Sequence, residues 1–355
     1  IMAYTTINKS TDHFNTKLYT GDGNNSKAIT GVGFQPDWIW IKKRSGTASH
    51  MISDSVRGVT KTIYTESTSA ELTSDQYGWV SAFGTDGFTT SNTNVGAINE
   101  NGGTYVSWNW KGGGSGSTNN DGAVTSTVSA NTTSGFSIVS YTGTGSTTTV
   151  GHGLGAKPSV VIYKQRNTTN AWRMMTDVSG TLKRLYLNAT DAEASIIDSS
   201  TAPTSTVLNI GTGSEVNTSS GTYIAYCFAE KTGYSKFGTY AGNNNTDGTF
   251  VYTGFKPAWI LAKAASGSQT PQNQSWPLWD NKRSSTGGFN ENSYKLYPNA
   301  TDAEATSGIA QVDILSNGFK FRNSTHQSNS TNTYFYMAFA EAPLVGSNNI
   351  PATAR

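Results

Sequence analysis

The chain has 355 residues, of which 14% are charged, and its formal net charge is +2. Without a basic run, this balance argues against nucleic acid as a partner and against membrane insertion, and no apolar stretch approaches the ~18 residues that span a bilayer. Aromatic residues make up 11% of the chain, which predicts a packed core rather than a disordered polar chain.

Aromatic and β-branched runs alternate with clusters of Gly, Asn, Asp and Ser along the whole chain, which predicts an all-β fold of many short strands. A lead-in strand is predicted within residues 1–17. The segment GFQPDWIWIKK follows, where Pro36 opens a strand that places Trp38 and Lys42 on one face. Residues 112–122, rich in Gly and Ser, are predicted to be a flexible linker.

The Pro36 segment recurs twice, as GAKPSVVIYKQ and GFKPAWILAKA. In every copy a Tyr-x-Gly triplet lies seventeen residues before the proline, and a lysine lies six residues after it. Equal offsets of this kind predict copies of one structural unit. The prolines and lysines of this framework are Pro36, Pro158, Pro257, Lys42, Lys164 and Lys263.

Each copy also ends in an aromatic strand, such as TYVSWNW or TYFYMAFAE. Units bounded by a strand at each end predict three tandem β-sandwich or jelly-roll-like repeats, at residues 18–111, 123–231 and 232–342. Residues 343–355 contain two prolines and no periodicity, which predicts an extended arm that contacts a partner.

The stretch NATDAEA occurs at 188–194 and again at 299–305, and a degraded copy lies in IYTESTSAEL at 63–72. Its aspartate becomes Ser69 in that first copy, and a metal cage that discards a charged ligand is less plausible than a structural turn capped by Thr or Asp. We therefore expect no metal, with calcium as the alternative. A catalytic role is the third interpretation. The glutamates that persist in all three copies are Glu71, Glu193 and Glu304, and the repeated lysines could neutralise the repeated carboxylates.

Motifs for catalysis or for a cofactor are missing from the sequence. The four histidines are scattered without paired metal spacing, and the single cysteine, Cys227, excludes a Cys-based zinc site. No Gly-x-Ser-x-Gly elbow occurs. We expect the protein not to be an enzyme and to use no cofactor.

Residues outside the repeated framework are the candidates for ligand binding. The third unit holds an insertion that is polar, aromatic and rich in amides, SGSQTPQNQSWPLWDNKRSSTGGFNEN. Long loops on rigid scaffolds often bind ligands, so we expect Trp279, Gln272, Asn273 and Gln274 to contact a sugar. Trp276, which lies four residues before Asp280, is expected in the core.

Three phrases of the chain resemble a repeated β-domain of uncharacterised function that is found in virion proteins of marine tailed bacteriophages. They are VSANTTSGFSIVSYTGTGSTTTVGHGLGAKPSVVIYKQRN, SVRGVTKTIYTESTSAEL and TYVSWNW. The resemblance covers nearly the whole chain and supplies no catalytic residues.

This resemblance implies a protein of the virion surface. One interpretation is a fibre-type or host-recognition component, assembled as a homo-oligomer (a trimer is expected) with other virion proteins, that binds host-surface polysaccharide. The alternative is a capsid-decoration or tail-adaptor protein that binds only other virion proteins. The absence of a collagen-like or coiled-coil shaft argues against a long fibre.

Overall fold

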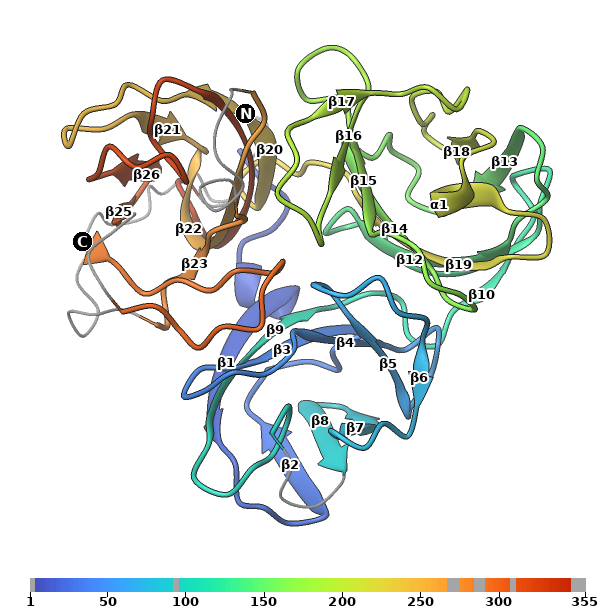
Figure 1. Cartoon of the computed structure of the whole chain (residues 1–355), viewed down its shortest axis with the longest axis horizontal. Helices are drawn as coiled ribbons and strands as arrows, with labels where there is room; N and C mark the ends of the chain where they lie inside the picture. The colour runs from blue at the N-terminus through green and yellow to red at the C-terminus, as the bar shows by residue number, and fades with distance from the viewer. Residues whose placement is uncertain (1–3, 92–95, 267–274, 284–290, 307–310, 346–355) are drawn as a thin grey trace.

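The computed structural model describes residues 4–91, 96–266, 275–283, 291–306 and 311–345 (Figure 1). Within these ranges the regular structure is β, apart from the 3-10 turn η1 (Ser10–Asp12) and the short helix α1 (Ser214–Asn217). The expected all-β fold is confirmed. None of the helices described is long and apolar enough to cross a membrane.

The strands form three lobes around a common centre, coloured blue, green and orange-red in Figure 1. We define lobe 1 as residues 14–110, lobe 2 as residues 117–228 and lobe 3 as residues 235–343. Each lobe has an inner sheet that faces the centre and an outer sheet that covers its other face. All strand pairs in these sheets are antiparallel.

The inner sheet of lobe 1 contains, in order, β1 (Phe14–Thr20), β9 (Thr104–Trp110), β3 (Trp38–Lys43), β4 (Met51–Asp54), β5 (Lys61–Tyr64) and β6 (Leu72–Thr73). Its outer sheet contains β2 (Ser26–Thr30), β8 (Gly87–Ser91) and β7 (Trp79–Gly84). The alternation of a strand explains the layering: Trp38 and Trp40 face the centre, whereas Ile39 and Ile41 pack between the two sheets.

The inner sheet of lobe 2 contains β10 (Ser117–Asn119), β11 (Ser126–Asn131), β12 (Phe136–Thr142), β19 (Thr222–Phe228), β14 (Val160–Gln165), β15 (Arg173–Thr176), β16 (Lys183–Tyr186) and β17 (Ala194–Ser195). Its outer sheet pairs β13 (Thr148–Gly151) with β18 (Val207–Ile210). Cys227 is buried in β19, as expected.

The inner sheet of lobe 3 contains β20 (Ser235–Ala241), β27 (Thr333–Pro343), β22 (Phe255–Ala264) and β23 (Leu278–Asp280). Its outer sheet contains β21 (Phe250–Tyr252), β26 (Gly318–Phe321), β25 (Val312–Leu315) and β24 (Glu291–Asn292). The strand order β20-β27-β22-β23 matches β1-β9-β3-β4 of lobe 1 and β12-β19-β14-β15 of lobe 2.

One aromatic core joins the three lobes at the centre. The ring of Trp38 lies 4.7 Å from that of Tyr226, which joins lobes 1 and 2. Trp110 and Trp259, at 5.6 Å, join lobes 1 and 3. Phe228 and Phe339, at 5.8 Å, join lobes 2 and 3. Each lobe therefore completes its core with rings from both of its neighbours.

The ends and the linker differ from the sequence-based prediction. Residues 4–13 contain no strand, and their one regular element is the 3-10 turn η1. The first strand, β1, begins at Phe14 and belongs to the inner sheet of lobe 1. The Gly/Ser segment 112–122 is anchored rather than free: the Gly113 amide donates to Ser129 Oγ, and β10 within it pairs with β11. Glycine amides that find acceptors lose the freedom that composition alone predicts.

The proposed arm at 343–355 begins inside β27, and the Leu344 amide donates to the Gly254 carbonyl. Residues 346–355 lie outside the described part of the chain.

The three framework prolines stand at or before the strands expected from them. Pro36 and Pro158 lie two residues before β3 and β14, rather than at the first strand position, whereas Pro257 lies within β22 at a shift in its pairing register. Proline lacks the N–H that a ladder requires, which accounts for both placements. Trp38 and Trp259, the residues two positions after their prolines, are confirmed as core residues.

Candidate functional site

The NATDAEA segments connect the lobes through backbone hydrogen bonds. The Glu71 amide donates to the Arg166 carbonyl at 2.8 Å, which joins lobe 1 to lobe 2. The Glu193 amide donates to the Ala265 carbonyl and the Glu304 amide to the Arg44 carbonyl, both at 2.9 Å. The three contacts run from lobe 1 to 2, from 2 to 3 and from 3 to 1, so they close a ring. A structural role for these segments accounts for their recurrence.

The three framework lysines secure the same loops from the opposite side of each junction. Lys164 Nζ donates to the Thr68 carbonyl at 3.0 Å, and Lys263 Nζ donates to the Thr190 carbonyl at 3.0 Å. Lys42 Nζ donates to the Thr301 carbonyl at 3.1 Å. Each amine also donates to a carbonyl of its own lobe, namely that of Lys43, Asn170 or Ala264. The charges of Asp302 and Glu304 favour the protonated form of Lys42, and that of Asp191 favours the protonated form of Lys263, so carboxylates act on these two lysines through charge while the hydrogen bonds go to carbonyls.

Burial of these lysines perturbs their protonation. Desolvation lowers the pKa of each amine to about 8. The carbonyls that accept from them carry no full charge, so they offset the loss of water only in part. The amines therefore change charge near neutral pH.

We expect the free energy of unfolding to rise between pH about 8 and about 10. A lysine in the unfolded chain keeps its proton up to about pH 10.4, whereas the folded protein releases these protons near pH 8. The unfolded state therefore binds more protons in this window, and raising the pH stabilises the fold, by about 2 kcal/mol per lysine. Urea unfolding at several pH values measures the effect.

The variant Lys164→Met should flatten this rise by about a third, since it removes one of three comparable groups. Above pH about 10 the ionisation of tyrosines in the unfolded chain opposes the gain. A stability that stays level or falls between pH about 8 and 10 would contradict the prediction.

Arginines, rather than the lysines, pair with the repeated glutamates at two junctions. Between lobes 1 and 2, Glu71 accepts from Arg166 Nε at 2.9 Å and from Arg57 Nη1 at 3.2 Å. Burial opposes the charge of Arg57, but Asp54, Tyr226 and Glu71 outweigh it and raise its pKa. Tyr226 donates its hydroxyl to Asp54 Oδ2 at 2.8 Å, across the same junction.

The junction between lobes 3 and 1 has the same arrangement. Glu304 accepts from Arg283 Nη1 and from Arg44 Nη2, both at 2.8 Å. Trp108 donates its indole N–H to Asp280 Oδ2 at 2.8 Å, in place of the tyrosine. Two of the three junctions therefore contain a buried ionic cluster.

The junction between lobes 2 and 3 lacks these charges. The strand pairing places Thr176 opposite Val160, where Asp54 stands opposite Trp38. At the other corresponding positions Ser179 replaces arginine, Ala265 replaces Arg166, and Met337 replaces Tyr226. Only Glu193 persists, and burial raises its pKa. The partners that correspond to Asp54, Arg57 and Arg166 are therefore all uncharged here.

Of the four residues predicted to bind a sugar, the structure describes Trp279. Trp279 has no exposed surface and packs against Phe321 in the core of lobe 3, so it offers no face for a ligand and that prediction is corrected. Gln272, Asn273 and Gln274 lie outside the described residues. Trp276 is buried, as expected, and donates to the Tyr186 carbonyl of lobe 2.

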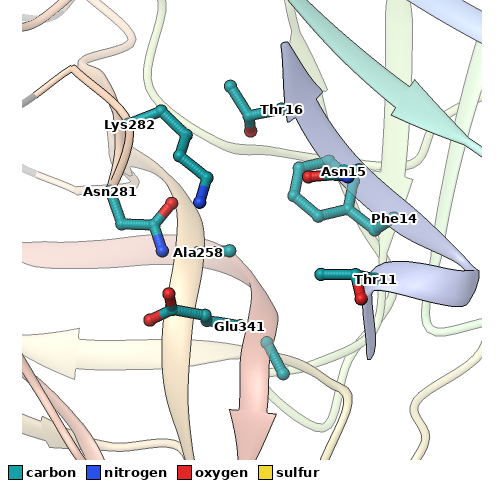
Figure 2. A pocket seen from close by; sticks show the side chains of 9 residues that line it. Thr11, Phe14, Asn15, Thr16, Ala258, Asn281, Lys282 and Glu341 are labelled. Atoms are coloured by element: carbon teal, nitrogen blue, oxygen red, sulfur yellow. The ribbon is translucent and has the colours of Figure 1, made fainter. Parts of the chain in front are cut away.

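A small cavity lies between lobes 1 and 3 (Figure 2). Residues of η1 and β1 border one side, and Asn281, Lys282 and Glu341 border the other. Two buried atoms at this cavity, Thr16 Oγ1 and Asn281 Oδ1, have no hydrogen-bond partner among the described residues. Its volume of about 40 Å³ suits one or two ordered waters and excludes a sugar ring.

A larger cavity lies where lobe 1 meets the second NATDAEA segment. Its volume is about 380 Å³, within the range of small-molecule sites. Tyr64 and Tyr77 supply aromatic walls, while Thr47, Ser49 and Thr301 supply hydroxyl groups at its lining. Tyr77 is 50% exposed although it is a large aromatic residue. We call this space the tyrosine cavity.

Two carboxylates, the buried Asp75 and the half-buried Glu66, bond to residues that line the tyrosine cavity. Tyr64 donates its hydroxyl to Asp75, and the Tyr77 amide also donates to Asp75, at 3.3 Å. Burial and this hydrogen bond raise the pKa of Tyr64, so its phenol stays protonated at neutral pH. Burial also raises the pKa of Glu66, which accepts from the His50 amide at 3.1 Å.

The sequence contained a weak signal for this cavity. Tyr77 stands in the polar turn SDQYGW, outside the repeated framework, as an exposed recognition residue would. Thr301, which lines the same cavity, belongs to lobe 3. No sequence spacing predicts that Tyr77 and Thr301 lie at one site. For a metal, the described residues contain no cluster of three or more His, Cys, Asp or Glu side chains.

Comparison with known proteins gives one family and no close relative. No curated protein and no solved structure matches the chain. A family model described as a domain of unknown function (DUF7483) matches residues 9–343, which include all three lobes. Because the match covers most of the chain, the protein belongs to the DUF7483 family.

Proposed function

We propose that this protein is a non-enzymatic component of a bacteriophage virion surface that binds glycans of the host cell. The observation that supports binding is the tyrosine cavity, which combines two aromatic walls with several hydroxyl groups. The virion assignment rests on the sequence resemblance described above.

A sugar suits the chemistry of this cavity better than an ionic ligand does. The C–H faces of a pyranose ring pack on aromatic rings such as Tyr77, while the polar edges of aromatic residues and nearby hydroxyls bind its hydroxyl groups. The side chains of Thr47, Ser49 and Thr301 are neutral donors and acceptors. Asp75 is already occupied by Tyr64 and the Tyr77 amide.

The proposal excludes catalysis because the nearby carboxylates hold the structure together. Glu66 accepts from the His50 amide, and Asp75 fixes Tyr64. The repeated carboxylates Glu71 and Glu304 are bound in ionic clusters. A general acid or base needs a carboxyl within hydrogen-bond reach of its substrate, and these groups are directed to protein atoms instead.

We further propose that the three lobes are tandem copies of one β-sandwich unit. The common strand order, the equal offsets around the prolines and the ring of equivalent lysine contacts support this proposal. The lobes use their junction surfaces within one chain. A homotrimer, or a contact with other virion proteins, would therefore form through the outer sheets.

Replacement of Tyr77 by alanine tests the glycan proposal. We expect retention of the purified protein on host cells, and its affinity for host-surface polysaccharide, to fall about two- to tenfold, since stacking on one aromatic ring contributes about 0.5–1.5 kcal/mol. Tyr77→Phe should retain binding because it keeps the ring. The melting temperature should stay unchanged, since Tyr77 is half exposed.

The same incubation distinguishes the alternatives. Release of new reducing ends from the polysaccharide would contradict the non-enzymatic proposal. A wild-type protein that neither cleaves the polysaccharide nor stays on the cells would favour the decoration or adaptor role.

A further inference from the structure

Two exposed aromatic side chains lie on one face of β21, in the outer sheet of lobe 3. Phe250 is 43% and Tyr252 is 51% exposed, whereas Val251 between them is buried. Alternation along a strand puts the first and third residues on the same face, about 7 Å apart. The two rings therefore form a pair, which we call the β21 platform.

The fold does not require aromatic rings at these positions. In lobe 1 the corresponding strand β2 pairs Ile29 with Phe88, as β21 pairs Val251 with Phe319. The flanking positions of β2 are Ala28 and Thr30. The inward residue of β2, Ile29, is thus apolar, as Val251 is in β21, while its outward residues, Ala28 and Thr30, are small and exposed.

Lobe 2 gives the same result. Its strand β13 keeps an apolar inward residue, Val150, which pairs with Leu208. The flanking positions are Thr149 and Gly151. Among these three corresponding strands, only β21 therefore places aromatic side chains outward, and large exposed rings that stability does not demand indicate a contact surface.

The residues around the β21 platform leave its two rings exposed, and the charged side chains among them are paired with each other. Opposite Tyr252 stands Gly318, which has no side chain to cover the rings. Opposite Phe250 stands Lys320, whose amine pairs with Asp247 at 2.7 Å. Arg322 pairs with Asp313 at 2.6 Å. With these charges neutralised by each other, an ionic ligand gains little here.

A polar cavity adjoins Tyr252 and extends the platform. Its volume is about 320 Å³, and its lining includes Tyr4, Glu230, Ser235 and Lys236. Tyr4 donates its hydroxyl to the Gly254 carbonyl at 2.9 Å, which holds it beside Tyr252. Donors and acceptors therefore stand next to the aromatic face, as recognition of a hydroxyl-rich ring requires.

We propose that the β21 platform and its adjoining cavity form a second carbohydrate site, for a neutral hexose oligomer. One sugar stacks on Phe250 and Tyr252, and the next enters the cavity, where Glu230 accepts from its hydroxyl groups and Lys236 donates to them. This site shares the ligand class of the proposed function but none of its residues. Two separate sites on one chain would strengthen attachment through effective concentration.

The test replaces both rings by threonine, the residue that lobes 1 and 2 carry at Thr30 and Thr149. The full chain, the variant Phe250→Thr/Tyr252→Thr and the control Ile197→Ala are titrated with cellohexaose, laminarihexaose and maltohexaose, with binding followed by ligand-observed NMR. Ile197 is an exposed apolar residue of lobe 2, far in sequence from the platform.

We expect the wild type and the control to bind at least one hexasaccharide, and the double variant to bind it at least about tenfold more weakly with an unchanged melting temperature. Equal binding by the double variant, or no binding of any hexasaccharide by the wild type, would overturn this inference. Tyr77→Ala separates it from the proposed function: loss of binding in Tyr77→Ala with full binding in the double variant supports the tyrosine cavity alone.

Discussion

Replacement of Trp38 by alanine is expected to lower the free energy of unfolding by about 3–5 kcal/mol. Its ring is 2% exposed and lies 4.5 Å from the Trp110 ring and 4.7 Å from the Tyr226 ring. The substitution removes an indole from a close-packed centre, and the neighbouring rings cannot all collapse into the space.

The effect should reach beyond lobe 1. Trp38 also faces Phe136 and Phe228 of lobe 2, both at 5.7 Å. Trp259 stands in the equivalent strand of lobe 3, 5.7 Å from Phe339, and Trp259→Ala should cost a similar amount. Because each lobe shares its core with its neighbours, we expect the wild type and both variants to unfold in one cooperative transition.

Chemical denaturation of the full chain measures these differences. Val59→Ala is the matched control, since Val59 is an exposed apolar residue of lobe 1 and its loss should change stability by less than about 0.5 kcal/mol. A Trp38→Ala variant as stable as the wild type would contradict the shared core. Separate transitions for the lobes would show that each has a core of its own.

Local patterns in the sequence predicted what depends on neighbouring residues. Alternation in WIWIKK identified a strand buried on both faces, and the structure places Trp38 and Ile39 in two different cores. Equal spacing identified Lys42, Lys164 and Lys263 as equivalent. Their acceptors across the junctions could not be predicted, since those carbonyls belong to another lobe.

Composition predicts the structure of a segment poorly where strand pairing or a backbone hydrogen bond determines it. The segment WPLWD was interpreted as part of a polar loop, but β23 pairs with β22 and directs Trp279 into the core of lobe 3. The composition of residues 112–122 predicts a flexible linker, but the Gly112 and Gly113 amides donate to Asp37 and Ser129. The sequence does not predict the tyrosine cavity, because its lining residues Tyr77 and Thr301 come from lobes 1 and 3 and share a site only in the folded chain.

Two junctions contain an ionic cluster of this kind and the third does not, which leads to a second large effect. Arg57→Ser should destabilise the protein by about 3–5 kcal/mol, since it leaves Asp54 buried without its cation. Both side chains are fully buried. The hydroxyl of Tyr226 would remain as a partner of Asp54, but a neutral donor compensates a buried carboxylate only in part.

The junction between lobes 2 and 3 indicates how the loss can be repaired. It places Thr176 and Ser179 where lobe 1 has Asp54 and Arg57. Adding Asp54→Thr to Arg57→Ser should therefore recover most of the lost stability, since it removes the unpaired charge together with its partner. Adding Tyr226→Met, the residue that Met337 provides in lobe 3, should recover more, because it replaces a hydroxyl left without its acceptor.

Urea unfolding of the wild type, both single variants, the double variant and the triple variant measures this cycle. We expect a coupling energy between Asp54 and Arg57 of at least about 2 kcal/mol, and the same sign for Asp280 and Arg283 at the matched junction. A double variant as unstable as Arg57→Ser alone would contradict the coupling: it would mean that Arg57 stabilises the fold through contacts other than its pairing with Asp54. If the double variant is restored, the pair contributes little net stability, as at the junction between lobes 2 and 3, where Thr176 and Ser179 stand in place of such a pair.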